Sequence, residues 1–170
     1  MKKFAGILIV IFAIALSAFA QKADDSKGPM AVVNQLWAEM AANNPAGIVA
    51  LHNPGAQLVA VIKTRDGKTI VRNLTVDEFS RGFADKTHTV KEDMYTSDVK
   101  VDGDLASVWG RYVFFIDGKV SHCGIDAFHL VRTDGVWKIG GIASTIDGGG
   151  CTEAEKARKA VPEPATAKPD

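Results

Sequence analysis

Apolar residues recur at helical spacing near the beginning of the chain and then give way to runs rich in β-branched and aromatic residues. Pro29 suits the first turn of a helix, where its missing N–H costs nothing. The residues that follow at helical spacing are Met30, Val33, Leu36, Trp37 and Met40. This spacing predicts an amphipathic helix that ends at residues 43–45, and a short second helix over 46–51.

Four Asp-Gly pairs separate the later apolar runs, at positions 66, 102, 117 and 134. Asp-Gly between such runs is typical of a β-hairpin, because both turn positions favour positive φ. The predicted strands are 58–64, 69–72, 88–101, 105–116, 119–132 and 136–146. Thr75 and Glu78 form a capping box that opens a helix to about residue 84. This order predicts an α+β protein with helices packed on one face of a curved antiparallel sheet.

A two-residue turn at Asp117-Gly118 fixes which side chains share a face, provided that no bulge shifts the register. One predicted face carries Trp109, Arg111, Val113, His122, Asp126, Phe128, Leu130, Trp137 and Ile139. The other carries Val108, Tyr112, Phe114, Cys123, Ile125, Val131, Ile142 and Ile146. Both faces are rich in apolar groups, so each needs a cover. We therefore predict a homodimer through the face that contains Tyr112, Phe114 and Ile125.

The first predicted face mixes charged side chains with large aromatic ones. Arg111, His122 and Asp126 lie on it with Trp109, Phe128 and Trp137. Such charges are costly to bury unless they pair or line a wet cavity. Two interpretations are open: ion pairs that stabilise the sheet, or an apolar pocket with a few convergent polar groups. The pocket is favoured, because helices over a strongly curved sheet tend to enclose a cavity.

The first twenty residues combine two lysines, an uncharged apolar stretch and the small-residue ending Ala18-Phe19-Ala20. This pattern predicts a secretory signal peptide cleaved after Ala20, and hence a periplasmic or secreted protein. The alternative is an uncleaved membrane anchor, for which the stretch is short. Residues 21–27 then form a flexible leader and residues 28–151 the domain. A short helix from 152 and a disordered Pro- and Ala-rich tail follow to residue 170.

Charge and cysteine content narrow the function classes further. Loss of Lys2 and Lys3 with the signal peptide changes 20 basic against 20 acidic residues to 18 against 20, a net charge of −2. The basic residues are scattered, so neither nucleic acid nor a membrane surface is predicted as a partner. Cys123 and Cys151 either form a disulfide, which an exported chain permits, or remain two buried thiols. The disulfide is the favoured interpretation.

The sequence contains no arrangement typical of a metal or a cofactor. His88, His122 and His129 are spread along the chain, and the last two lie on opposite strand faces. Residues 148–150 are glycines, but no Gly-Lys-Ser/Thr follows them. We predict neither a bound metal nor a cofactor.

Several segments together resemble the nuclear transport factor 2-like superfamily, and in particular its SnoaL-like and lumazine-binding-like branches. They are the two-helix opening, residues 51–56, the hairpin, and the stretches 109–115, 121–128 and 135–139. The resemblance spans about residues 30–151. It implies a cone-shaped, cystatin-like fold with a pocket. The superfamily includes isomerases, dehydratases, cyclases, epoxide hydrolases and non-catalytic binding or assembly modules, so fold alone does not choose among them.

The resemblance also suggests roles for individual residues. Enzymes of the superfamily use a pocket carboxylate as general base, which by position is Asp126, with His122 assisting. Arg111 opposes a raised pKa at Asp126 and favours binding an anionic group. No Tyr falls on the predicted pocket face as an oxyanion donor.

Three functional hypotheses therefore stand. The leading one is a small-ligand-binding domain whose pocket is lined by Arg111, Trp109, Phe128 and Trp137. The second is an isomerase, dehydratase or hydrolase of small cyclic substrates, with Asp126 and His122 as catalytic residues. The third is a non-catalytic interaction module whose cavity is filled by side chains. The sequence leaves open whether the protein is an enzyme.

Overall fold

A computed structural model describes residues 28–159. The predicted signal peptide (1–20), the leader (21–27) and the last residues (160–170) lie outside this range. The helices are α1 (Pro29–Ala41), α2 (Pro45–Ala50), α3 (Val76–Arg81) and α4 (Glu153–Lys156). The strands are β1 (His52–Lys63), β2 (Thr69–Thr75), β3 (Val90–Met94), β4 (Asp98–Asp102), β5 (Leu105–Ile116), β6 (Lys119–Thr133) and β7 (Val136–Asp147). Within 28–159 no helix is long and apolar enough to cross a membrane.

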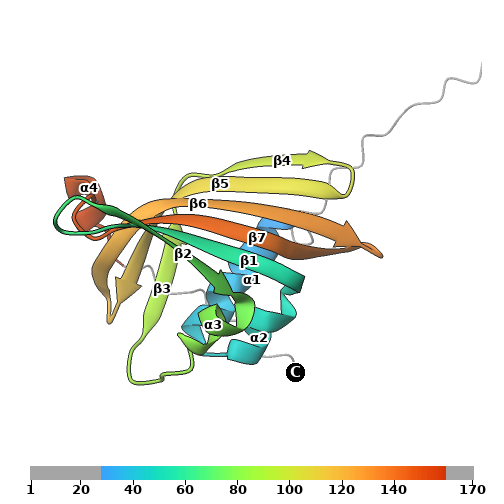
Figure 1. The fold of residues 1–170 in the computed structure, drawn as a ribbon, viewed down its shortest axis with the longest axis horizontal. Helices are drawn as coiled ribbons and strands as arrows, with labels where there is room; N and C mark the ends of the chain where they lie inside the picture. Colours follow the sequence, from blue (N-terminus) through green and yellow to red (C-terminus); the bar gives the residue numbers. More distant parts are fainter. Residues whose placement is uncertain (1–27, 160–170) are drawn as a thin grey trace, which may run out of the picture.

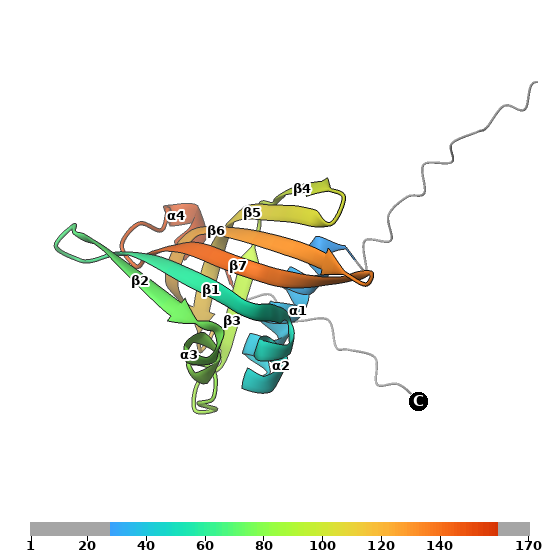
Figure 2. The same ribbon diagram turned by 45° about the vertical axis from the view of Figure 1, so that its right-hand side comes forward.

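The strands form one curved sheet in the order β2-β1-β7-β6-β5-β3, with β4 pairing with another part of β5 (Figure 1). Helices α1, α2 and α3 lie together on one side of this sheet, and α4 lies at its far end (Figure 2). The predicted α+β architecture is therefore confirmed. The sheet is mixed rather than wholly antiparallel, because β1 and β7, which are distant in sequence, pair in parallel.

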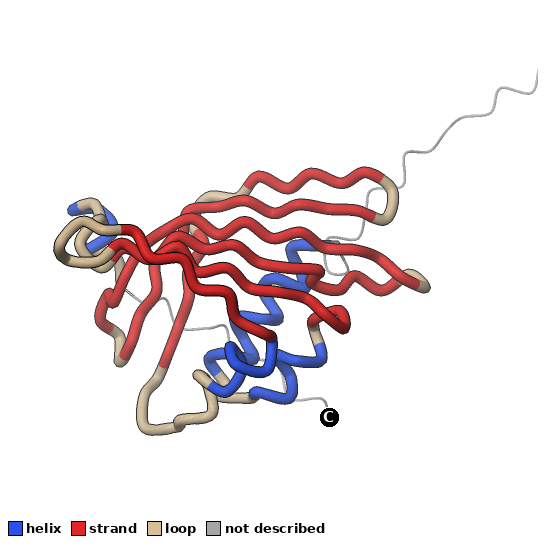
Figure 3. Tube along the Cα trace, viewed as in Figure 1, coloured by secondary structure: helices blue, strands red, loops and turns tan. Residues whose placement is uncertain are grey.

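The predicted strand 88–101 is two strands, which pair with different stretches of β5 (Figure 3). The chain changes direction opposite Gly110, where a Cβ atom would lie 2.1 Å from the carbonyl oxygen of Thr96. Only glycine lets the two backbones approach this closely. The Thr96 hydroxyl accepts a hydrogen bond from the Arg111 N–H at this break. Before this break in the strand, β3 pairs with residues 112–116 of β5 at the edge of the sheet, and Glu92 lies opposite Phe114.

Two irregularities in pairing correct the predicted faces. The turn at Asp117-Gly118 has the expected positive φ at both residues. A bulge follows in β6, between Val120 and His122. Because of it, His122 pairs with Phe114 rather than with Val113. A second bulge, at His129, sets Asp126 against Ser144 rather than against Ala143. Since one extra residue reverses which face a strand presents to its partner, the odd-numbered residues of β5 lie opposite to where the sequence predicts.

The main core lies between the three N-terminal helices and the concave face of the sheet. The apolar face of α1 is buried as predicted, with Val33 and Leu36 at most 2% exposed. Val108, Leu130 and Ile139 supply the sheet side and are fully buried. A cavity remains within this core, because Leu36, Met40 and Phe128 belong to the core and also line the cavity.

The C-terminal segment is anchored on the outer side of the sheet. Cys123 and Cys151 form a disulfide, with their Cα atoms 5.3 Å apart, so this predicted pairing is confirmed. Val113 and Phe115 of β5 pack against the two cysteines in a small second core. Helix α4, which follows directly, has its own capping box at Thr152 and Glu155. The predicted short helix is thus present and held against the sheet.

Candidate functional site

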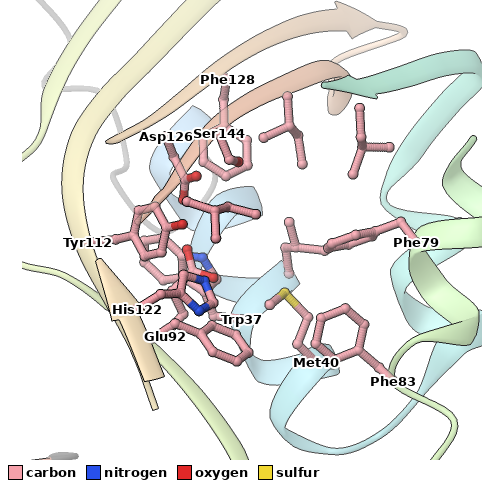
Figure 4. Close-up of a pocket in the computed structure, with 15 residues that line it drawn as sticks. Trp37, Met40, Phe79, Phe83, Glu92, Tyr112, His122, Asp126, Phe128 and Ser144 are labelled. Atoms are coloured by element: carbon pink, nitrogen blue, oxygen red, sulfur yellow. The ribbon is translucent and has the colours of Figure 1, made fainter. Parts of the chain in front are cut away.

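A cavity of about 210 Å³ lies between α1, α3 and the concave face of the sheet (Figure 4). Its wall is mostly apolar and aromatic. The apolar lining residues are Leu36, Met40, Leu58, Phe79, Phe83, Phe114, Phe128, Ile142 and Ile146. The polar lining groups lie together at one side, while Phe79 and Phe83 lie at the other. An apolar wall with a few convergent polar groups is the usual form of a small-molecule site.

Two carboxyl groups, Glu92 of β3 and Asp126 of β6, lie next to each other in the wall of this cavity. Asp126 is 4% exposed, and Ser144 is its partner in the neighbouring strand. Burial and then the adjacent Asp126 charge raise the pKa of Glu92 well above its usual range, and burial raises the pKa of Asp126. We call this pair the carboxyl dyad; the raised pKa values favour one proton shared between its two groups.

Three aromatic polar side chains flank the carboxyl dyad. The Tyr112 hydroxyl donates a hydrogen bond to the Thr145 carbonyl oxygen at 2.9 Å, and burial raises its pKa. The His122 ring stacks on Phe114 with 4.8 Å between centroids, and burial lowers its pKa. Both side chains are therefore uncharged near pH 7.

Trp37 of α1 brings a third polar group to the cavity. Its indole N–H is buried and makes no hydrogen bond of normal geometry within residues 28–159. It still lies close enough to Glu92 to offset part of the rise in that residue's pKa. A buried donor without a partner is costly, so a ligand acceptor or a bound water would stabilise it.

Arg111 lies on the opposite face of the sheet and is absent from the cavity wall. Its Nε and Nη2 donate to the Glu155 carboxylate, at 2.5 and 3.0 Å. The Tyr95 hydroxyl donates to the same carboxylate at 2.6 Å. These contacts hold the pKa of Glu155 far below its usual range. The predicted contact of Arg111 with the pocket carboxylate is thus wrong, and with it the argument that Arg111 keeps Asp126 acidic.

The other predicted ligand-binding residues are distributed over three environments. Phe128 lines the cavity beside the predicted catalytic residues Asp126 and His122, as the sequence predicts. Trp137 is buried in the core with the Arg132 guanidinium 5.0 Å from its ring centroid, but it does not line the cavity. Trp109 is 56% exposed on the outer face, because the β6 bulge reverses the predicted register there.

The predicted dimer face does not exist as a single surface. Tyr112 and Phe114 are 2% and 8% exposed and face the cavity, whereas Ile125 lies on the outer side. The prediction that no tyrosine lies on the pocket face is also wrong, because Tyr112 lines the cavity.

The sequence analysis does not assign four polar cavity residues to the site: Glu92, Trp37, Tyr112 and Ser144. Glu92 belongs to a strand that the alternation pattern joined to its neighbour, so nothing placed its carboxyl beside Asp126. The available indication was weak: in the segment Val90–Met94, Glu92 is spaced two residues from Val90 and from Met94 and so shares a strand face with two apolar side chains. Among residues 28–159 no group of three or more His, Cys, Asp or Glu side chains converges as a metal site.

No family model matches the sequence, and no curated protein matches it either. Solved structures do match. A protein of unknown function with a cystatin-like fold from Nostoc punctiforme aligns with a TM-score of 0.55 and 10% identity, over 71% of this chain and 89% of its own. A nuclear transport factor 2-like protein from Cytophaga hutchinsonii gives 0.52 and 13%, over 69% and 93%. A candidate beta subunit of an aromatic-ring-hydroxylating dioxygenase from Novosphingobium aromaticivorans gives 0.57 and 11%, over 69% and 86%. At these identities the likeness concerns the fold alone.

Proposed function

Because the chain has the nuclear transport factor 2-like, cystatin-like fold that its sequence predicts, we propose that it is a domain that binds a small molecule in the cavity between its helices and its sheet. The observation that carries the proposal is the cavity itself, which is apolar on most sides and holds the carboxyl dyad at one end. Placement in the SnoaL-like or lumazine-binding-like branch stays a prediction.

The contents of the cavity favour a binding site over a merely imperfect core. A structural core rarely retains two carboxyl groups without a cation, because their desolvation is costly. The buried Trp37 N–H without a hydrogen bond adds a second unsatisfied group in the same place. Both costs fall when a ligand with matching polar atoms enters.

Export to the periplasm or the medium belongs to the same proposal. The disulfide between Cys123 and Cys151 supports it, because such bonds persist in oxidising compartments and are rare in the cytosol. The intact mass of the exported protein tests the site of cleavage. A protein that begins at Gln21 fits the proposal, and a retained Met1 contradicts it.

Native mass spectrometry of protein purified from its own host tests the binding function. We expect a retained small molecule that is lost on denaturation. The variant Ile142→Phe adds volume to the cavity wall and should lose the adduct. Adduct-free wild-type protein that also binds no small aromatic compound in titrations would contradict the proposal.

One observation favours a second candidate, acid–base catalysis. The raised pKa values of the carboxyl dyad favour one protonated and one ionised carboxyl side by side, an arrangement in which Asp126 accepts a proton while Glu92 donates one. Small cyclic ketones incubated with the protein in D₂O would exchange their α-protons, followed by NMR. Exchange that disappears in Asp126→Asn supports this candidate, and the absence of exchange across the ketones counts against it.

A homodimer remains part of the proposal, now through the outer face of the sheet. A row of residues crosses four neighbouring strands there: Val59, Ala143, Ala127 and Trp109. Trp109 is exposed, and the small residues beside it border a shallow depression. We propose that Trp109 of each copy covers this row on the other. Light scattering should show a dimer for the wild type and a monomer for Trp109→Ala; a wild-type monomer at micromolar concentration would contradict it.

A further inference from the structure

We infer that the ligand of this cavity is a small organic cation, an apolar or aromatic body that carries one protonated amine, with the ammonium group held by Glu92 and Asp126. The inference rests on the proposed function, since it names the ligand class for the same cavity.

The charges around the cavity are all of one sign. Among residues 28–159, the charged side chains in its wall are Glu92 and Asp126, and no Lys or Arg of this part of the chain lines it. Arg111, predicted from the sequence to be near, is bound to Glu155 on the other side of the sheet. The carboxyl dyad with one proton therefore leaves a negative charge in a mostly apolar space. A cation supplied by the ligand is the group that compensates it.

The remaining wall suits the rest of such a ligand. Aromatic rings surround the carboxyl dyad, among them Trp37, Tyr112 and Phe128, and ring faces attract ammonium groups. A cavity of about 150 Å³ accommodates benzene. The 210 Å³ found here therefore suits about eight to ten non-hydrogen atoms.

Other ligand classes complement the cavity less well. A carboxylate or phosphate would meet two carboxyl groups and no cation, so it would be repelled. An alcohol or ketone of the same size could form one hydrogen bond with the carboxyl dyad but would leave its charge uncompensated. The two carboxyl groups should therefore bind an amine most tightly, a neutral molecule of the same shape less tightly, and a carboxylic acid least tightly.

The affinity for an amine should also depend on pH, because the carboxyl dyad exchanges a proton when the ammonium group binds. An ammonium group favours the fully ionised carboxyl dyad, so its binding should release the shared proton and strengthen as pH rises from 6 to 9. The other titratable groups that face the carboxyl dyad are Tyr112 from β5 and His122 from β6. Tyr112 stays protonated over this range, and the lowered pKa of His122 keeps it neutral over most of it. A neutral ligand should show no comparable increase in affinity.

The test is a calorimetric titration of the full chain with three matched probes: 2-phenylethylamine, 2-phenylethanol and phenylacetate. We expect the amine to bind at least tenfold more tightly than the alcohol at pH 8, and phenylacetate to bind least. Glu92→Gln/Asp126→Asn should remove the preference for the amine while the alcohol still binds. The control Asp102→Asn/Asp134→Asn removes two exposed carboxylates that do not line the cavity and should keep the preference.

Each outcome separates the inference from the function on which it rests. A preference for the amine below tenfold, or one that survives Glu92→Gln/Asp126→Asn, overturns the inference and leaves the binding function standing. Absence of binding by all three probes, and by indole as an uncharged aromatic probe, overturns the binding function as well. If the double variant fails to fold by circular dichroism, Glu92→Gln alone replaces it, with the same expected loss of preference.

Discussion

The protein buries carboxylates in two regions, and it treats them differently. On the outer side of the sheet Glu155 is 2% exposed and receives bonds from Arg111, Tyr95 and the Thr152 N–H. On the inner side Glu92 and Asp126 lie next to each other, and within residues 28–159 no Lys or Arg lines the cavity that holds them. The pKa of Glu155 is lowered, and those of the inner pair are raised.

This difference is the one expected between a charge that stabilises the fold and a charge that serves the proposed binding site. Glu155 is satisfied within the chain, and the disulfide beside it fixes the helix that carries it. The carboxyl dyad is only half satisfied and borders a cavity. Pairs of titratable groups whose surroundings shift their pKa values are common at sites of binding and catalysis. The outer network therefore stabilises the fold, whereas the carboxyl dyad supports the proposed ligand site.

The largest expected effect on stability comes from removing the disulfide that attaches the C-terminal segment to the outer side of the sheet. Cys123→Ala/Cys151→Ala opens a loop with a sequence separation of 28 and should lower the free energy of unfolding by about 3–4 kcal/mol. Denaturant unfolding with and without reductant measures it. Reductant should destabilise the wild type similarly and leave the variant unchanged. A wild type that is indifferent to reductant would contradict a stabilising role for the disulfide.

A smaller loss should follow when the outer carboxylate is deprived of its cation. Arg111→Ala leaves Glu155 buried, with Tyr95 and Thr152 as its remaining donors. We expect a loss of about 2–3 kcal/mol, below the value for a wholly buried pair because the Arg111 side chain is 34% exposed. Lys156→Ala, which removes the exposed ion pair with Glu153 on the same helix, is the matched control and should change stability by less than about 0.5 kcal/mol. Equal losses in the two variants would contradict the distinction.

Neutralising Glu92 and Asp126 should raise the free energy of unfolding rather than lower it. Carboxyl groups with raised pKa values bind more protons in the folded state, so their contribution to stability falls as pH rises from about 4. Glu92→Gln/Asp126→Asn should therefore be more stable than the wild type by about 1–2 kcal/mol at pH 8 and nearly equal to it at pH 4. Urea unfolding at both pH values measures this. A destabilised variant at pH 8 would show that the carboxyl dyad is structural.

The smallest effect concerns a residue that the sequence placed in the pocket. Trp109→Ala alters the outer face, across the sheet from the cavity, and should change the affinity for 2-phenylethylamine by less than about twofold. A calorimetric titration of the variant checks it. A tenfold loss would return Trp109 to the binding site.

The sequence was sufficient for the fold because its strongest patterns are local. The apolar face of α1, the capping box at Thr75 and the Asp-Gly turns each depend on residues close together in the chain. The parallel pairing of β1 with β7 depends on residues about eighty positions apart, and no local pattern specifies it. The division of the strand at residues 95–97 likewise follows from the close approach at Gly110.

The site was predictable only along one strand. Asp126, His122 and Phe128 share a face of β6 by simple alternation, and they do line the cavity together. Alignment between strands failed, because a single extra residue at Ser121 exchanged Arg111 for Tyr112 on that face. Glu92 was missed for the same physical reason: its position relative to Asp126 is set by how β3 crosses β5.

The protonation state of the carboxyl dyad tests the central claim most directly. Carbon-13 NMR of side-chain carboxyl groups, assigned with Glu92→Gln, Asp126→Asn and Glu155→Gln, can follow each group from pH 3 to 9. We expect Glu92 and Asp126 to keep one proton between them at pH 7, while Glu155 stays ionised to the acid end of the range. Titration of both Glu92 and Asp126 near the ordinary value of about 4 would contradict the account.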